Sequence, residues 1–157
     1  MRIVSAVLLL LLIGGCGAGG GGAATEPGTV IIGVSIQAPT ASDIIYALEF
    51  TVELPPGVTV QADPTTGEVA NGVLKVPFSN GLADARYEPA TATDRAKVKV
   101  NIASPSGFMP GEIAVITCTA SGADLSAANF TVDGFSAKDQ NGATMPDISP
   151  LLTERTQ

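Results

Sequence analysis

Few residues of this 157-residue chain have side chains suited to catalysis or covalent modification. The chain contains no histidine, and so lacks the commonest general base, the commonest transition-metal ligand and the usual pH switch. Two cysteines, Cys16 and Cys118, and fifteen acidic residues remain. Cys16 follows an apolar leader and two glycines, and this placement makes it the clearest candidate for chemistry.

The leader before Cys16 has the character of a secretory signal. Arg2 precedes an apolar run over residues 4–13, which is too short to cross a bilayer because a span needs about 20 apolar residues. The run ends in Leu12-Ile13-Gly14-Gly15-Cys16, which resembles the lipobox of bacterial lipoproteins. The resemblance implies cleavage after Gly15, a diacylglyceryl group on the Cys16 sulfur and acylation of the new amino terminus. The alternative is an ordinary signal peptide that happens to contain a cysteine.

The segment after Cys16 is predicted to be a tether. Residues 17–27 have no large apolar side chain and no periodicity, so we expect a flexible coil reaching roughly 17 to 20 Å root-mean-square. Several acyl chains anchor firmly, because each buried methylene contributes about 0.8 kcal/mol. Gly17, and not aspartate, follows Cys16, which in a Gram-negative cell favours the outer membrane. We therefore expect a signal peptide over residues 1–15, a lipidated Cys16 with its tether over 16–27, and a place in the bacterial cell envelope.

The charge of the chain argues against nucleic acid as a partner. The formal net charge is −7, whereas phosphate binding depends on clustered lysine and arginine. Only Arg95, Lys97 and Lys99 lie close together, and they alternate along one predicted strand. We interpret them as a solvated strand surface or as edge protection, in preference to a binding patch.

Alternating hydrophobicity predicts a long strand within residues 43–60. Six large apolar side chains share one parity there: Ile44, Tyr46, Leu48, Phe50, Val52 and Leu54. A period of two indicates a strand with one buried face. Pro55-Pro56-Gly57 ends it, because proline cannot donate to a ladder and glycine permits the turn.

Further strands are predicted on both sides of this one. They cover residues 29–37, 57–62, 72–78, 95–103, 112–120 and 130–135, with a hairpin over 136–148 closed by Asn141-Gly142. We expect turns over residues 104–111, a helical turn capped by Asp124, and a short tail over 149–157. Residues 79–94 are the longest irregular stretch and are either a functional loop or an insertion. The pattern predicts an all-β, antiparallel, jelly-roll-like β-sandwich of about 8–9 strands over residues 28–148.

The order of these segments resembles the cohesin domain, and more broadly the cohesin and cellulose-binding-module group of sandwiches. The resemblance lies in Ala47-Leu48-Glu49-Phe50-Thr51-Val52, Gly57-Val58-Thr59-Val60, Gly111-Glu112-Ile113-Ala114-Val115-Ile116-Thr117, Ala123-Asp124-Leu125-Ser126, Asn129-Phe130 and Lys138-Asp139-Gln140-Asn141-Gly142. It implies a nine-stranded sandwich without a catalytic role, and cohesins bind dockerin domains through one sheet face. Glu53-Leu54-Pro55-Pro56 departs from the Tyr-Asp-Pro that often follows this strand in cohesins, so we transfer no binding residue.

The second cysteine and one acidic loop have structural explanations. Cys118 alternates with apolar neighbours and no histidine can activate it, so we expect a small buried hydrophobe. Asp139-Gln140-Asn141-Gly142 begins like a calcium-binding EF-hand loop but lacks the required later glycine and glutamate, which favours a hairpin turn. A looser calcium site built from separated loops stays open as an alternative.

The carboxylates and rings give little support to sugar chemistry. Glu49 and Glu53 should lie about 13 Å apart along one strand, farther than the roughly 5 to 9.5 Å of glycosidase pairs. We interpret both as solvated face residues. Sugar platforms need exposed rings, but there is no tryptophan, Tyr46 is predicted in the core and Tyr87 in the long loop.

These observations predict a lipid-anchored extracytoplasmic module that is not an enzyme and requires no cofactor or metal. Its expected partners are the membrane, through acylated Cys16, and an unidentified protein. A carbohydrate-binding module that recognises polysaccharide is the alternative, and an enzyme is the least favoured class. Exposed planar rings on one sheet would favour carbohydrate, whereas an apolar sheet face without rings would favour a protein partner.

Overall fold

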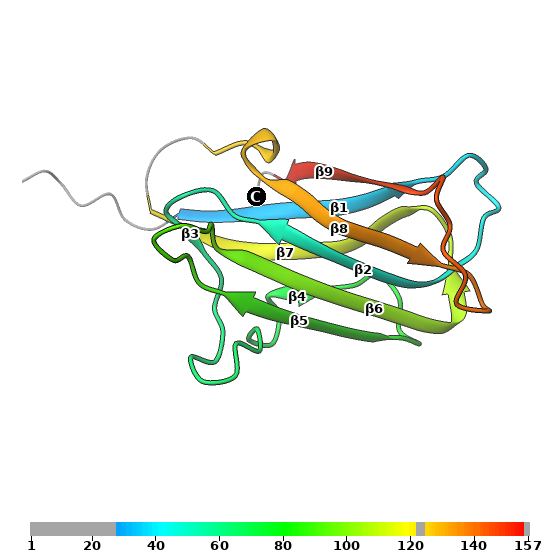
Figure 1. Cartoon of the computed structure of the whole chain (residues 1–157), viewed down its shortest axis with the longest axis horizontal. Helices are drawn as coiled ribbons and strands as arrows, with labels where there is room; N and C mark the ends of the chain where they lie inside the picture. The colour runs from blue at the N-terminus through cyan, green and yellow to red at the C-terminus, as the bar shows by residue number, and fades with distance from the viewer. Residues whose placement is uncertain (1–27, 122–124, 156–157) are drawn as a thin grey trace, which may run out of the picture.

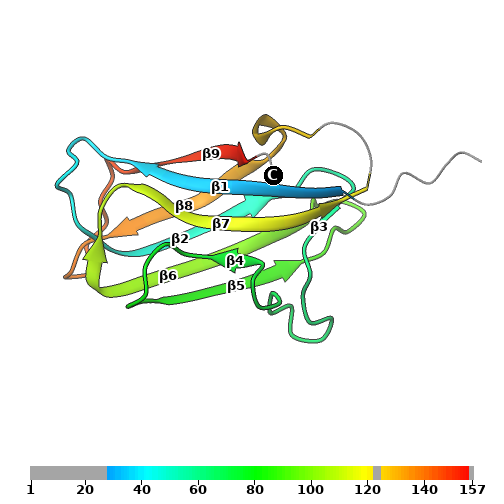
Figure 2. The same cartoon turned by 180° about the vertical axis from the view of Figure 1, so that it is seen from behind.

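The computed structural model describes residues 28–121 and 125–155. This part of the chain forms nine β-strands in two antiparallel sheets that pack face to face (Figures 1 and 2). The only helical element there is the short 3₁₀ helix η1 (Ala127–Asn129). The predicted all-β sandwich of about nine strands is therefore confirmed.

One sheet has five strands. Its order is β3 (Val58–Thr59), β7 (Gly111–Ala120), β1 (Gly28–Gln37) and β9 (Ser149–Arg155), and β4 (Leu74–Lys75) also pairs with β7. β7 has β1 on one side and the short β3 and β4 on the other, so it is an inner strand of this sheet. Pro77, which cannot donate to a ladder, lies just after β4 and outside its pairing.

The other sheet has four strands. Its order is β5 (Leu82–Glu88), β6 (Lys97–Phe108), β2 (Ile45–Glu53) and β8 (Thr131–Lys138). β2 and β6 are its two inner strands, and their alternating side chains supply the largest part of the core from this sheet. Phe50 is 1% exposed and packs near Phe135, with the two ring centroids 6.5 Å apart.

The predicted parity of β2 holds from Leu48 to Leu54 and fails before that point. A bulge between Ile45 and Ala47 shifts the register against β6, so that Ile45 is fully buried. Ile44 is 48% exposed, and Tyr46 is half-buried. The prediction that Ile44 and Tyr46 belong to the core is therefore wrong, because a bulge exchanges the two faces of a strand.

A second bulge explains the spacing of apolar residues in β8. Gly134 has a φ of 61°, in the left-handed region that favours glycine, and the register against β2 shifts at this point. Val132 and Phe135, which are three residues apart, can therefore both pack against the core. Phe130, which directly precedes β8, is 4% exposed and belongs to the core.

Several predicted boundaries are corrected by the pairing. Residues 79–94 are not all irregular, because they contain β5. Residues 149–155 of the predicted tail are a strand, because β9 pairs with β1 along seven residues. β6 continues through residues 104–108, which leaves Met109 and Pro110 as the connection to β7. The hairpin over 136–148 returns through an isolated bridge between Lys138 and Thr144.

Three shorter segments also differ from the sequence expectation. The strands predicted over 57–62 and 72–78 shrink to the two-residue β3 and β4. Ser126 is the N-cap of η1, and its N–H donates to the Asn129 side chain at 2.8 Å. The expected cap, Asp124, lies outside the residues that the structure describes, as do the leader and tether over residues 1–27.

The strands run between two poles of the molecule. β1 begins at the near pole, where Gly28 pairs with Ala120, and ends at the far pole, where Ile36 pairs with Gly111. The connection between β6 and β7 also lies at the far pole (Figures 1 and 2). Anything attached before Gly28 therefore joins the sandwich at the end opposite this connection.

Two neighbouring leucines test the assignment of β9 to the sandwich. Leu152 packs against the core, whereas Leu151 is 44% exposed. We expect Leu152→Ala to lower the free energy of unfolding by about 2 kcal/mol, and Leu151→Ala to change it by less than about 0.5 kcal/mol. Urea denaturation of both variants measures the difference. Equal, small effects would mean that residues 149–155 do not belong to the fold.

Candidate functional site

The outer face of the four-stranded sheet carries the surface with the most distinctive chemistry. Cross-strand pairing places its outward side chains in rows that run from β5 across β6 and β2 to β8. The row at the far pole is Leu82, Ala103, Ala47 and Lys138, and the next row is Asp84, Asn101, Glu49 and Ser136. The composition of the face changes from one pole to the other.

The far-pole end of this face is apolar and hollowed. We use the name apolar row for Leu82, Ala103 and Ala47. Leu82 is 80% exposed and, with Tyr46, Ala103 and Pro105, lines an open hollow of about 610 Å³. Tyr46 contributes to this hollow because the β2 bulge turns it out of the core.

The hollow has a rigid support beneath it. Ser104, the only buried polar residue in the part of the chain described, donates to the Asn80 carbonyl at 3.2 Å and so fixes β6 to the start of β5. Phe78 and Phe108 stack with ring centroids 5.1 Å apart. A Cβ at Gly81 would meet the Phe78 ring at 2.6 Å, so glycine is required where the chain passes over this pair.

Two carboxylates stand beside the apolar row. Glu49 and Asp84 flank Asn101 in the second row, and all three line a hollow of about 350 Å³ that also includes Leu82 and Ala103. We use the name acidic row for Glu49, Asn101 and Asp84. The three ion pairs found among the described residues involve neither Glu49 nor Asp84.

Toward the near pole two lysine–glutamate ion pairs lie on the face. Lys99 lies 2.6 Å from Glu88, and Lys97 lies 3.5 Å from Glu53. The predicted solvated surface around these lysines is confirmed, but edge protection is not, because β6 lies between β5 and β2. Such exposed pairs add little stability but leave little net charge to attract a polyanion.

Large exposed apolar side chains are few, and most belong to the far pole. In residues 28–121 and 125–155 they are Ile44, Leu82, Met109 and Leu151. Ile44 and Tyr46 lie beside Gly107, and Met109 directly follows β6. No aromatic side chain belongs to this exposed set, and Phe78 and Phe108 are half-buried.

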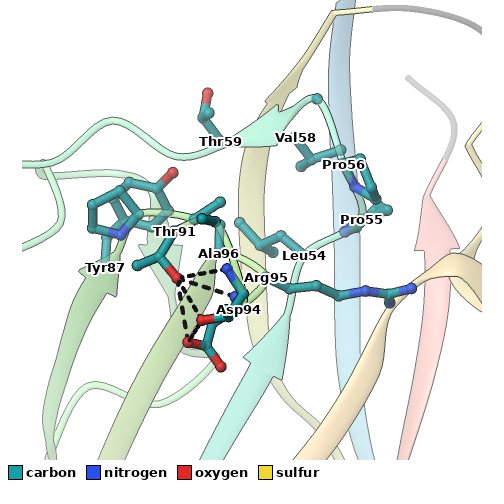
Figure 3. A pocket seen from close by; sticks show the side chains of 15 residues that line it. Leu54, Pro55, Pro56, Val58, Thr59, Tyr87, Thr91, Asp94, Arg95 and Ala96 are labelled. Atoms are coloured by element: carbon teal, nitrogen blue, oxygen red, sulfur yellow. Dashed lines mark hydrogen bonds between the residues drawn. The ribbon is translucent and has the colours of Figure 1, made fainter.

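Another cavity lies at the near pole, between the connection that follows β2 and the loop that joins β5 to β6 (Figure 3). It measures about 530 Å³ and is lined mainly by proline, alanine and threonine, with Leu54, Val58 and Tyr87. Thr91 and Thr93 donate to the Asp94 carboxylate at 3.2 and 2.9 Å, which closes the loop on itself. Burial raises the pKa of the Tyr87 hydroxyl, with a smaller contribution from Cys118.

The structure separates the other residues that the sequence singled out. Glu49 and Glu53 lie on the outer face as expected, and Glu53 also accepts a hydrogen bond from Thr131 at 3.2 Å. The Asp139 carboxylate accepts backbone N–H groups of Asn141 and Ala143 at 2.9 and 2.8 Å, which is the expected turn. In the part of the chain described, no three metal-ligating side chains cluster.

Sequence reasoning missed Leu82 and Asp84, which lay in the predicted irregular stretch. The alternation of Ala83, Ala85 and Tyr87 was the available signal, but alanine side chains are too small for a clear hydrophobic period. Tyr87 lies on β5 and not in a loop. Cys16 and Gly15 fall outside the described residues.

Comparisons with models of known protein families, with curated proteins and with solved structures find no match for this chain. Within residues 28–121 and 125–155, no helix has the length and apolar character needed to cross a bilayer. The function must therefore be argued from the surface itself.

Cys118 gives a pH-dependent test of its predicted burial. It is 2% exposed, and burial raises the pKa of its thiol from 9.0 to about 12. The unfolded thiol ionises first, so the stability linked to Cys118 is fully present below about pH 9 and is lost as the pH rises toward about 12.

We therefore expect the unfolding free energy to fall more steeply between about pH 8 and about pH 10 in the wild type than in Cys118→Ala. The excess loss should be on the order of 1 kcal/mol, because one pKa unit corresponds to about 1.4 kcal/mol. Urea denaturation at both pH values measures it. An identical pH dependence in the two proteins would contradict a buried thiol.

Proposed function

We propose that this chain is a lipid-anchored, extracytoplasmic binding module without catalytic activity, and that it docks a protein on the outer face of its four-stranded sheet. The observation that carries the proposal is the exposed apolar surface at the far pole, which contains no exposed ring. Leu82 is 80% exposed, Met109 is 68% exposed and Ile44 is 48% exposed. Leu82 also lines an open, mainly apolar hollow with Tyr46, Ala103 and Pro105, and exposed apolar surface of this kind is typical of interaction sites.

A protein partner explains this surface better than polysaccharide does. Sugars stack on exposed rings, whereas Tyr46, the ring nearest the hollow, is half-buried and borders small alanine side chains. A carbohydrate-binding module therefore remains the second candidate. The resemblance of the sequence to cohesins, which bind protein partners through a sheet face, favours the same choice.

The lipid anchor is supported by the leader and by the position of Gly28. The lipobox-like Ile13-Gly14-Gly15-Cys16 implies acylation of Cys16. Gly28 begins β1 at the near pole, so a tether that precedes it leaves the far-pole hollow accessible away from the membrane. We place the module in the bacterial cell envelope and, in a Gram-negative cell, favour the outer membrane because Gly17 follows Cys16.

The remaining reactive groups support a non-enzymatic role. The chain has no histidine, and the Cys118 thiol is buried with a pKa of about 12, so it does not form a thiolate near neutral pH. The carboxylates of Glu53 and Glu88 form ion pairs with Lys97 and Lys99. The role that we propose requires no cofactor and no metal.

Acylation of Cys16 is tested by removing each cysteine in turn. In a bacterial host, we expect the wild-type chain and Cys118→Ala to incorporate labelled palmitate and to sediment with membranes. Cys16→Ser should lose the label and leave the membrane fraction, because it lacks the sulfur that carries the diacylglyceryl group. A wild-type chain that carries no label would contradict the lipid anchor.

Docking is tested with a photo-crosslinking amino acid placed at Leu82 or at Leu151 of the full chain in its native cells. Both side chains are exposed, but they lie on different sheets. We expect a discrete protein adduct from position 82 and none from position 151, with the adduct identified by mass spectrometry. Equal crosslinking from both positions, or none from position 82, would contradict a protein partner on this face.

A further inference from the structure

The charges on the outer face of the four-stranded sheet are unevenly compensated. Lys97 and Lys99 are paired with Glu53 and Glu88 near one pole. Glu49 and Asp84 have no such pairing and stand on either side of the neutral Asn101. Of the charged side chains that line the hollow beside the apolar row, Glu49 and Asp84 are negative and Lys138 is positive, so the lining has a net charge of −1 within a chain whose net charge is −7.

The apolar row and the acidic row are next to each other in register. Leu82 and Asp84 are two residues apart on β5, as are Ala47 and Glu49 on β2 and Ala103 and Asn101 on β6. Two residues along a strand correspond to about 7 Å. One hollow of about 350 Å³ includes both rows, so a single partner element can contact both.

We propose that the partner presents a basic amphipathic helix, with an apolar side chain in the hollow beside Leu82 and Ala103 and a lysine or arginine against Glu49 and Asp84. This inference rests on the proposed docking function and names the chemistry of the partner. Side chains three or four residues apart on a helix have Cβ atoms about 5–6 Å apart and extend farther at their tips, which matches the spacing between the rows. Complementary charge fixes the orientation, while apolar burial supplies most of the affinity.

Other occupants fit this surface less well. An anionic membrane would be repelled by the acidic row and by the net charge of −7. A second copy of the chain would have to bring the same acidic row against itself, or match its two carboxylates with the single Lys138 ammonium group that lines the hollow. A cationic partner can contact both rows, with Lys138 as the one like charge among the residues that line the hollow.

The test uses the isotope-labelled full chain and two helical peptides of about 14 residues, long enough to form a helix on binding. One contains leucine and lysine, with leucine on one face, and the other has every lysine replaced by glutamate. We expect the leucine–lysine peptide to bind, with NMR shift changes confined to the outward residues of β5, β6 and β2. The leucine–glutamate peptide should bind at least about tenfold more weakly, a difference of about 1.4 kcal/mol.

Matched variants separate the specific site from general charge. The double substitution Glu49→Gln with Asp84→Asn should weaken binding of the leucine–lysine peptide about tenfold. The control is Asp147→Asn with Glu154→Gln, which changes the net charge by the same amount at exposed positions away from this face. It should change the affinity for the leucine–lysine peptide less than about twofold. Leu82→Ser should abolish the shift changes on the face, whereas Leu151→Ser should preserve them.

Several outcomes would overturn the inference. Equal binding of both peptides, or equal effects of the two double substitutions, would contradict a basic partner. Either result would still be compatible with a docking face that acts through apolar contacts alone. An absence of peptide binding would also contradict a basic helical partner. Crosslinking from position 82 tests separately whether any protein docks on this face. Dimerisation that is lost in Leu82→Ser would assign the face to a second copy, and binding to vesicles of neutral or anionic lipid would assign it to a membrane.

Discussion

The register of β2 against β6 is the constraint on which the rest of the structure depends. From the pair Ala47–Ala103 to the pair Glu53–Lys97 the ladder is uninterrupted, so Leu48, Phe50 and Val52 point into the core from one strand. Because side chains alternate, the same register sends Ala47, Glu49 and Glu53 to the outer face. One set of hydrogen bonds thus determines both what the sandwich buries and what its outer surface presents.

As a consequence, the outer face changes from charged at the near pole to apolar at the far pole. At the near pole long charged side chains pair across strands, and at the far pole small alanines leave room beside Leu82. The bulge at the start of β2 adds Tyr46 to this end by turning it out of the core. This graded surface, with an open hollow beside Leu82 and two carboxylates next to it, is the one on which we propose that a protein partner docks.

The sequence predicted the fold class and the strands with a strong period of two, such as Ala96 to Ile102, because large apolar side chains alternate there with charged ones. It could not predict β5, whose inward Ala85 is small, or the full length of β6, because Ser104-Pro105-Ser106-Gly107 has the composition of a turn. The candidate site lies where these signals are weakest. Leu82, Asp84 and Tyr46 come together through pairing and a bulge, and both depend on contacts between distant parts of the chain.

The cross-strand contacts of β2 with β6 test this account most directly. Nuclear Overhauser effects between backbone protons should connect Ala47 with Ala103 and Ile45 with Phe108, as the bulged register requires. Tyr46 should show contacts to Leu82 and Pro105, which line the same hollow. An uninterrupted ladder that pairs Ile45 with Pro105 and places Tyr46 in the core would contradict the account, since it would remove the hollow and the order of rows that docking requires.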